Sequence, residues 1–349
     1  MKIKRIVCVC LVLVMAFCGF TGCKSKKKAE LNILTWEGYF PEELLSSFEK
    51  EYDVKINYTN MTSNEEMLSK LENAKGGDYD VILASDYIIK MAIDEGLVSE
   101  LDMDKLPNYK NISDNYKGYY YDENNRYTVP YAPGIPYIVY NPEKVSIDIT
   151  GYESLWDASL KGSVCVMDNE RVVLGMALKT MGKSFNEEDE GVLLKAADKL
   201  YELAPNIRVI DGNYAYRYLI DGEVSVAYLY TSSVILALNE NPNLKVVAPK
   251  EGLGYGVDAL FVPDQAPNKD MAFKFLNYIM DGKNAAAVAE WTCYLNPNEA
   301  ANEYLSDWYK SAIANMEDDK NKGEFIKDVK PDALDIHTKI WEEFLKKVK

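Results

Sequence analysis

The segment Leu31–Phe48, LNILTWEGYFPEELLSSF, contains the pattern that decides the fold. It begins with a short apolar run, Leu31–Leu34, which predicts a β-strand. Pro41 then suits the first position of a helix, and the two glutamates that follow favour the positive end of the helix dipole. The apolar residues Leu44, Leu45 and Phe48 give this helix one face to bury. The segment therefore predicts a strand followed by an amphipathic helix.

The same alternation of strand and helix continues along most of the chain. Further strands are expected at 54–58, 79–83, 137–140, 163–166, 208–210, 224–229, 244–247 and 258–262. Further helices are expected after the capping box of Ser63 and Glu66, and at 88–95, 172–182, 188–203, 213–221, 232–239 and 268–281. The polar tract 102–126 is expected to be a surface excursion. This order predicts an α/β fold with two doubly wound, mostly parallel sheets.

The first 28 residues indicate an export signal and a tether. Basic residues precede the apolar run Ile6–Phe20, which at about 15 residues is shorter than the ~20 that a spanning helix needs. The sequence Phe20–Cys23, FTGC, resembles a bacterial lipobox, in which the signal peptide is cut before a cysteine that then carries lipid. We therefore expect a lipoprotein signal peptide over 1–22, lipid on Cys23 and a tether over 23–29; an ordinary cleaved signal peptide is the alternative.

The charge of the chain excludes one class of partner. The 349 residues include 39 basic and 55 acidic ones, for a net charge of -16. Once Lys2, Lys4, Arg5 and the four lysines of 24–28 are set aside, the net charge falls from -16 to -23. Binding to nucleic acid depends on Lys and Arg surfaces, so a general nucleic-acid binder is disfavoured, whereas cations are attracted.

Few residue patterns in the sequence indicate a metal site or a catalytic site. Cys165 and Cys293 lie in apolar surroundings; they could pair, but two buried free thiols fit better. His337 is the only histidine and is expected to be exposed on a C-terminal helix. No Cys/His spacing supports zinc, and neither an HExxH nor a GxSxG motif occurs, so we expect no metal, no cofactor and no enzymatic activity. A surface glycan hydrolase that acts through a pair of acids is the alternative.

Aromatic and acidic residues gather where the expected strands end. In open α/β sheets ligands bind beyond the carboxyl ends of the strands. The residues at these positions are Trp36, Glu37, Tyr39, Ser85, Asp86, Tyr87, Asp168, Asn169, Glu170 and Tyr230. Aromatic faces attract cations, and carboxylates accept short hydrogen bonds from ammonium groups. This pattern indicates a site for an organic cation.

The order of several short blocks resembles the spermidine/putrescine-binding proteins of polyamine ABC importers. The blocks are Leu34–Pro41, Ser63–Glu65, Asp80–Ser85, Val129–Tyr131, Leu155–Asp157, Lys161–Ser163, Met176–Leu178, Pro249–Gly252, Phe275–Tyr278 and Pro297–Asn298. They cover nearly the whole chain after the leader. Each block is weak alone, but their order and spacing are specific.

The resemblance implies a two-lobed periplasmic-binding-protein fold of type II, in which each lobe is a mostly parallel sheet flanked by helices. Lobe 1 would comprise 30–132 and 257–300, and lobe 2 would comprise 133–256 and 301–349. The ligand would be clamped between the lobes, and hinge closure would signal loading to the membrane partner. The implied protein is a monomeric, lipid-anchored substrate-binding component on the outer face of the cell membrane. Its partners would be a polyamine and the ABC permease subunits.

The resemblance also implies a set of ligand-binding residues. Trp36, Tyr39, Ser85, Tyr87, Asp258 and Tyr294 match the family's contacts, and Asp258 matches the carboxylate that holds a ligand amine. Tyr230 replaces a tryptophan. Four positions depart from the pattern: Asn169 replaces an aspartate, Val172 a glutamate, Gly256 a tryptophan and Ile326 a glutamine. Glu37 and Asp86 could compensate, and another organic cation or small solute is the alternative ligand.

Overall fold

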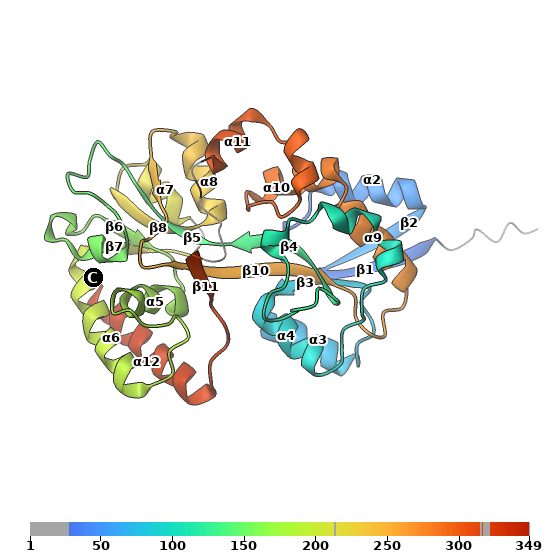
Figure 1. Cartoon of the computed structure of the whole chain (residues 1–349), viewed down its shortest axis with the longest axis horizontal. Coiled ribbons are helices and arrows are strands. Elements are labelled where there is room, and N and C mark those ends of the chain that lie inside the picture. The colour runs from blue at the N-terminus through green and yellow to red at the C-terminus, as the bar shows by residue number, and fades with distance from the viewer. Residues whose placement is uncertain (1–27, 213, 315, 317–321, 349) are drawn as a thin grey trace, which may run out of the picture.

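A computed structural model describes residues 28–348 except 213, 315 and 317–321, and it contains two β-sheets that lie side by side with helices around each (Figure 1). We call each sheet with its helices a lobe. The predicted signal peptide and the lipidated Cys23 lie outside the described residues. No helix in the described part of the chain is long and apolar enough to cross a membrane.

The first sheet has six strands in the order β11-β10-β3-β1-β2, with β4 paired to β10. Its strands are β1 (Ala29–Thr35), β2 (Val54–Asn60), β3 (Val81–Ser85), β4 (Thr128–Gly134), β10 (Leu253–Phe261) and β11 (Gly323–Phe325). Strand β1 lies parallel to β2 and β3, as the strand-helix alternation predicts. The second sheet has the order β7-β6-β8-β5-β9. Its strands are β5 (Pro136–Tyr140), β6 (Val164–Val166), β7 (Ile207–Ile210), β8 (Val226–Tyr230) and β9 (Lys245–Val247).

Both sheets also contain antiparallel pairs, so each sheet is mixed. Strand β10 runs antiparallel to β3 and β4, and β5 runs antiparallel to β8 and β9. Strand β5 enters the second sheet directly from β4 of the first sheet, whereas its antiparallel partners β8 and β9 each follow a helix. In Figure 1, β10 also extends from one lobe toward the other. The two-lobed α/β fold is confirmed. Its antiparallel elements are the strands that pass between the lobes.

Helices cover both sheets. Those beside the first sheet are α2 (Glu42–Tyr52), α3 (Asn64–Asn73), α4 (Asp86–Asp94), α9 (Lys269–Ile279) and α10 (Gly282–Thr292). Those beside the second are α5 (Glu170–Thr180), α6 (Glu190–Leu203), α7 (Ala215–Ile220), α8 (Thr231–Glu240), α11 (Asp307–Ile313) and α12 (Pro331–Lys347). One hydrophobic core joins β1, β3 and β10 to α2, α4 and α9, while separate cores lie on the two faces of the second sheet.

The prediction for the tract 102–126 is wrong in part. The tract forms three short 3-10 helices, Met103–Lys105, Pro107–Asn111 and Asp114–Tyr116, and Tyr109, Tyr116, Tyr119 and Tyr121 are buried in the first core. Tyrosine rings are mainly apolar, so a polar-looking tract can bury its rings. Asp122 is buried as well, where it accepts the backbone amides of Arg126, Tyr127 and Thr128.

The prediction for His337 is also wrong, because this side chain is fully buried. It belongs to the inner stripe of α12, whose buried residues are Ala333, His337, Ile340, Trp341 and Phe344. Helix α12 packs on α5 and α6, so this stripe faces the second core. Burial and the nearby Arg171 lower the pKa of His337 to about 4. Cys165 and Cys293 are free, buried thiols.

Candidate functional site

Asp258 lies where three strands of the first sheet meet. The antiparallel register places Asp258 of β10 opposite Ser85 of β3 and Ala132 of β4. The Ser85 hydroxyl donates a hydrogen bond of 2.7 Å to Oδ1 of Asp258, and the Tyr39 hydroxyl donates one of 3.1 Å to Oδ2. Burial raises the pKa of Asp258 to about 6, although both hydrogen bonds favour the charged form. Each carboxylate oxygen keeps a lone pair for a further donor.

Aromatic side chains surround this carboxylate. Gly38, with a φ of 77°, adopts the left-handed conformation that favours glycine and forms the turn between Trp36 and Tyr39. The rings of Trp36 and Tyr39 have centroids 5.2 Å apart, and those of Tyr39 and Tyr294 are 6.2 Å apart. Burial, together with the neighbouring Tyr294 and Asp258, raises the pKa of Tyr230. Electron-rich rings beside a carboxylate are suited to an ammonium group and its methylene chain.

Asp86 is a second carboxylate beside Asp258 and is only 2% exposed. It is the first residue of α4, where its Oδ1 accepts the Tyr87 amide at 2.6 Å and its Oδ2 accepts the Val257 amide at 3.1 Å. Burial raises the pKa of Asp86 to about 7, and the negative charge of Asp258 adds to the rise. A cation placed near both carboxylates would relieve their mutual repulsion.

A cavity of about 380 Å³ adjoins this cluster and has walls from both lobes. Its lining residues are Asn64, Glu65, Ser85, Asp86, Tyr87, Gly134, Asn169, Arg171, Val172, Tyr230, Tyr255, Gly256, Ile326, Lys327, Asp328 and Leu334. We call it the cleft cavity. Five predicted site residues line it, and the Ser85–Asp258 hydrogen bond connects it to the aromatic cluster of Trp36, Tyr39 and Tyr294. All four departing positions, Asn169, Val172, Gly256 and Ile326, meet in this cavity.

Three predicted residues, Glu37, Asp168 and Glu170, belong neither to the cavity lining nor to the neighbouring cluster of Trp36, Tyr39, Asp258 and Tyr294. Glu37 is exposed in the turn after β1, and Asp168 is exposed after β6. The Glu170 carboxylate accepts a hydrogen bond of 3.2 Å from Thr338 on α12. Glu170 therefore contacts α12 rather than the aromatic cluster.

Sequence reasoning missed several lining residues. Asn64 donates hydrogen bonds to the Ser85 hydroxyl at 3.2 Å and to the Tyr87 hydroxyl at 3.1 Å, so it positions both. The block Ser63–Glu65 carried a signal for it, but there the sequence predicts only a helix start. Lys327 and Asp328 were missed because they follow β11, a strand of three residues with no clear periodicity.

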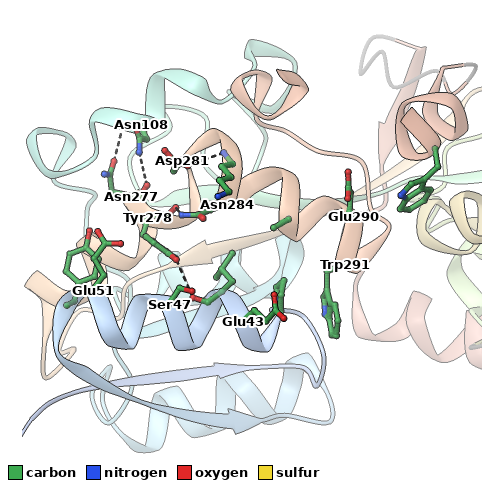
Figure 2. Close-up of a pocket in the computed structure, with 16 residues that line it drawn as sticks. Glu43, Ser47, Glu51, Asn108, Asn277, Tyr278, Asp281, Asn284, Glu290 and Trp291 are labelled. Carbon is green, nitrogen blue, oxygen red and sulfur yellow. Dashed lines mark hydrogen bonds between the residues drawn. The ribbon is translucent and has the colours of Figure 1, made fainter. Parts of the chain in front are cut away.

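A larger groove of about 900 Å³ lies elsewhere, between α2 and the helices α9 and α10 (Figure 2). It is lined by acidic residues and by the exposed Trp291, but by none of the predicted site residues. Several of its polar groups already pair with one another: the Asn108 amide donates to Asn277 at 2.9 Å, and Asn284 donates to the Tyr278 carbonyl at 2.9 Å. The cleft cavity, which has walls from both lobes, is lined by Asp86 and reaches Asp258 through Ser85, is the candidate solute site. Among the described residues no cluster of His, Cys, Asp or Glu is arranged to hold a metal ion.

Two lobes joined by crossing strands, with a polar cavity between them, define the class of two-lobed solute-binding proteins. Residues 43–317 match the family described as bacterial extracellular solute-binding protein. The chain is 32% identical over 335 residues to the spermidine/putrescine-binding periplasmic protein of Escherichia coli, with 95% of this chain and 94% of the relative covered. The chain therefore belongs to this family of bacterial extracellular solute-binding proteins.

Other relatives agree with this assignment. The chain is 26% identical to a putrescine/cadaverine-binding protein of Pseudomonas aeruginosa, with 90% and 93% of the two chains covered. A solved spermidine/putrescine ABC transporter substrate-binding protein from Streptococcus pneumoniae matches with a TM-score of 0.80 at 30% identity, covering 92% of this chain and 100% of that one. These relatives are named as binding proteins, which favours the binding hypothesis over the glycan hydrolase.

Proposed function

We propose that this protein captures a polyamine of the spermidine or putrescine type in the cleft cavity and delivers it to an ABC importer. The ammonium group lies against Asp258 and Asp86, and its methylene chain packs on Trp36, Tyr39, Tyr230 and Tyr294. The protein has no catalytic role of its own.

The observation that carries this proposal is the pair of neighbouring carboxylates at the cleft, the buried Asp86 and the half-buried Asp258. Asp258 and Asp86 have raised pKa values, and among the described residues no lysine or arginine lies close enough to either carboxylate to lower its pKa. A buried acidic site without a basic partner gains most from a cationic ligand, because charge-assisted hydrogen bonds replace the mutual repulsion of the carboxylates.

The remaining parts of the proposal concern the cell surface. Cys23 carries the lipid anchor, and 23–29 tethers the domain to the outer face of the membrane. Lobe 1 comprises 30–132 and 257–300, and lobe 2 comprises 133–256 and 301–349. The monomer closes on its ligand, and the closed lobes dock on the permease subunits.

Isothermal titration calorimetry on the mature chain, stripped of ligand by unfolding and refolding, tests this function. The titrants are putrescine, spermidine and spermine, with choline as an organic cation that lacks N–H donors. We expect saturable binding of at least one polyamine and much weaker binding of choline, because a carboxylate with hydrogen-bonded neighbours prefers an N–H donor. Absence of binding to every polyamine, or tighter binding of choline, would contradict the proposal.

A further inference from the structure

The two walls of the cleft cavity present opposite chemistry. The first-lobe wall offers mainly acceptors: Glu65 and Asp86 line the cavity directly, and Asp258 lies behind Ser85. An ammonium group carries only donors, so it matches this wall.

The second-lobe wall offers donors. The Asn169 side-chain oxygen accepts the Val172 amide at 3.1 Å, as expected of a helix N-cap, and its NH₂ group donates to the Tyr230 hydroxyl at 3.2 Å. A hydroxyl that accepts from Asn169 keeps its own proton to donate. An ammonium cannot accept that proton, whereas a carbonyl oxygen can.

Charge on the second-lobe wall also disfavours a second ammonium. Arg171 lines this side of the cavity, and Lys327, which follows β11 and contacts Tyr120 of the first lobe, lines it nearby. Among the described residues that line this wall, the only carboxylate is that of Asp328. Asp328 is exposed and accepts the Val329 amide at 2.9 Å. It also lies close enough to Arg171 to favour the charged form of the guanidinium. The lining side chains here are thus two cations and one anion, and Glu170 and Glu188 also lie close enough to Arg171 to favour its charged form.

The cations of this wall are already engaged elsewhere, so they do not form a carboxylate site. The Arg171 guanidinium donates to the Phe185 carbonyl at 3.3 Å and to Asn186 at 3.4 Å. The Lys327 ammonium lies over the Tyr120 ring, 4.8 Å from its centroid. Between them the wall surface is made by the uncharged side chains of Val172 and Ile326.

From these contacts we propose that the cleft cavity prefers a polyamine with one free ammonium end and one end capped by a neutral acyl group. The free end binds the first-lobe carboxylates. The acyl carbonyl accepts from Tyr230, and the acyl methyl packs on Val172 and Ile326. This inference rests on the proposed polyamine-binding function.

Calorimetry with three ligands that differ only at one end tests the preference: putrescine, N-acetylputrescine and 4-aminobutyrate. For the mature, ligand-stripped chain we expect N-acetylputrescine to bind at least tenfold more tightly than either of the others. Putrescine binding equally or more tightly would overturn this inference and leave the proposed function standing. Tightest binding of 4-aminobutyrate would also overturn it. If neither putrescine nor N-acetylputrescine binds, this inference fails, and the proposed function fails with it only when spermidine and spermine do not bind either.

A charge placed on the second-lobe wall gives an independent test. Val172 is the third residue of α5, a position in the first turn where glutamate is favourable to the helix dipole. Val172 is also buried beside the second core, so folding of the Val172→Glu protein is verified first, and in the folded protein we expect a shift of at least tenfold toward putrescine. Val172→Gln is the matched neutral control and should keep the preference for N-acetylputrescine. An unchanged preference in a folded Val172→Glu protein, checked by circular dichroism, would contradict the inference.

Discussion

The two walls of the cleft cavity differ in how the fold builds them. On the first lobe, strand register places Asp258 beside Ser85, and the start of α4 places Asp86 next to them at the cavity wall. On the second lobe, the start of α5 places an amide, Asn169, against Tyr230. The first wall is acidic and buried, and the second is a donor surface with apolar side chains. The difference indicates that the first wall attracts an amine, whereas the second wall selects the chemical group at the other end of the ligand.

The largest expected effect comes from neutralising the first wall. We expect Asp258→Asn to weaken polyamine binding by about 100-fold, because the loss of one partner of a buried charged hydrogen bond costs ~2–5 kcal/mol. Calorimetry measures the change. Asp168→Asn is the matched control, since Asp168 is exposed outside the cavity, and it should change affinity less than twofold. Equal effects of the two substitutions would break the distinction between these acids.

The first wall should also make binding depend on pH. The pKa values of Asp258 and Asp86 are raised to about 6 and about 7, so both gain protons as the pH falls from 8 to 5.5. A polyamine stays protonated over this range, because amines of this type have pKa values near 10. Affinity should therefore fall by about tenfold between pH 8 and pH 5.5. Titrations in buffers of different ionisation enthalpy should show proton release on binding near pH 6.5; affinity that does not change with pH would contradict the assignment.

The aromatic cluster should contribute less than the carboxylates. Trp36→Ala removes a ring that packs on Tyr39, and we expect about a fivefold loss of affinity, in line with ~0.5–2 kcal/mol for a cation–π contact. Trp291→Ala is the matched control, because Trp291 lies among acidic residues in the groove of Figure 2 and outside the cleft cavity. Loss of binding in Trp291→Ala with retention in Trp36→Ala would move the site to that groove.

The smallest expected effect is on stability. The free energy of unfolding should depend on pH with opposite signs for His337 in the second lobe and for Asp258 and Asp86 in the first. The pKa of His337 is lowered from its usual value to about 4, so the unfolded chain binds its proton first as the pH falls. The stability that the neutral histidine contributes is present above pH 6.5 and is lost as the pH falls toward 4, by about 1 kcal/mol between pH 7 and 5.5. The raised pKa values of Asp258 and Asp86 act in the opposite direction.

Urea unfolding at several pH values measures the His337 effect. His337→Phe keeps a ring in the core and removes the titration, so the difference in free energy of unfolding between wild type and variant should change by this amount over the range. A difference that stays constant with pH would show that His337 is protonated equally in the folded and unfolded states.

Much of the fold was predictable because it rests on local patterns. The strand Leu31–Leu34 and the helix after Pro41 appear in the structure within two residues of their expected starts. Strands that pass between lobes were less predictable: β4 was missed and β10 was expected only at 258–262, because register and direction depend on partners far along the chain. His337 could have been found, since its spacing from Ile340, Trp341 and Phe344 places it on one helix face.

Site residues that directly follow strands were predictable from the sequence, whereas lining residues at other positions were not. Ser85, Asp86 and Tyr230 stand at strand ends, and the structure brings them to one cavity. Asp168 and Glu170 stand at a similar position, but the start of α5 leaves the former exposed and binds the latter to α12. A strand end alone does not say which of three consecutive side chains will face the cleft.

A crystal structure of the ligand-stripped protein with bound N-acetylputrescine tests the central claim most directly. The account predicts one amine in the cleft cavity, with its ammonium within hydrogen-bonding distance of Asp258 or Asp86 and its acyl oxygen facing Tyr230. An ammonium placed beside Arg171 and Lys327, or a ligand in the groove of Figure 2 with the cleft cavity empty, would contradict it.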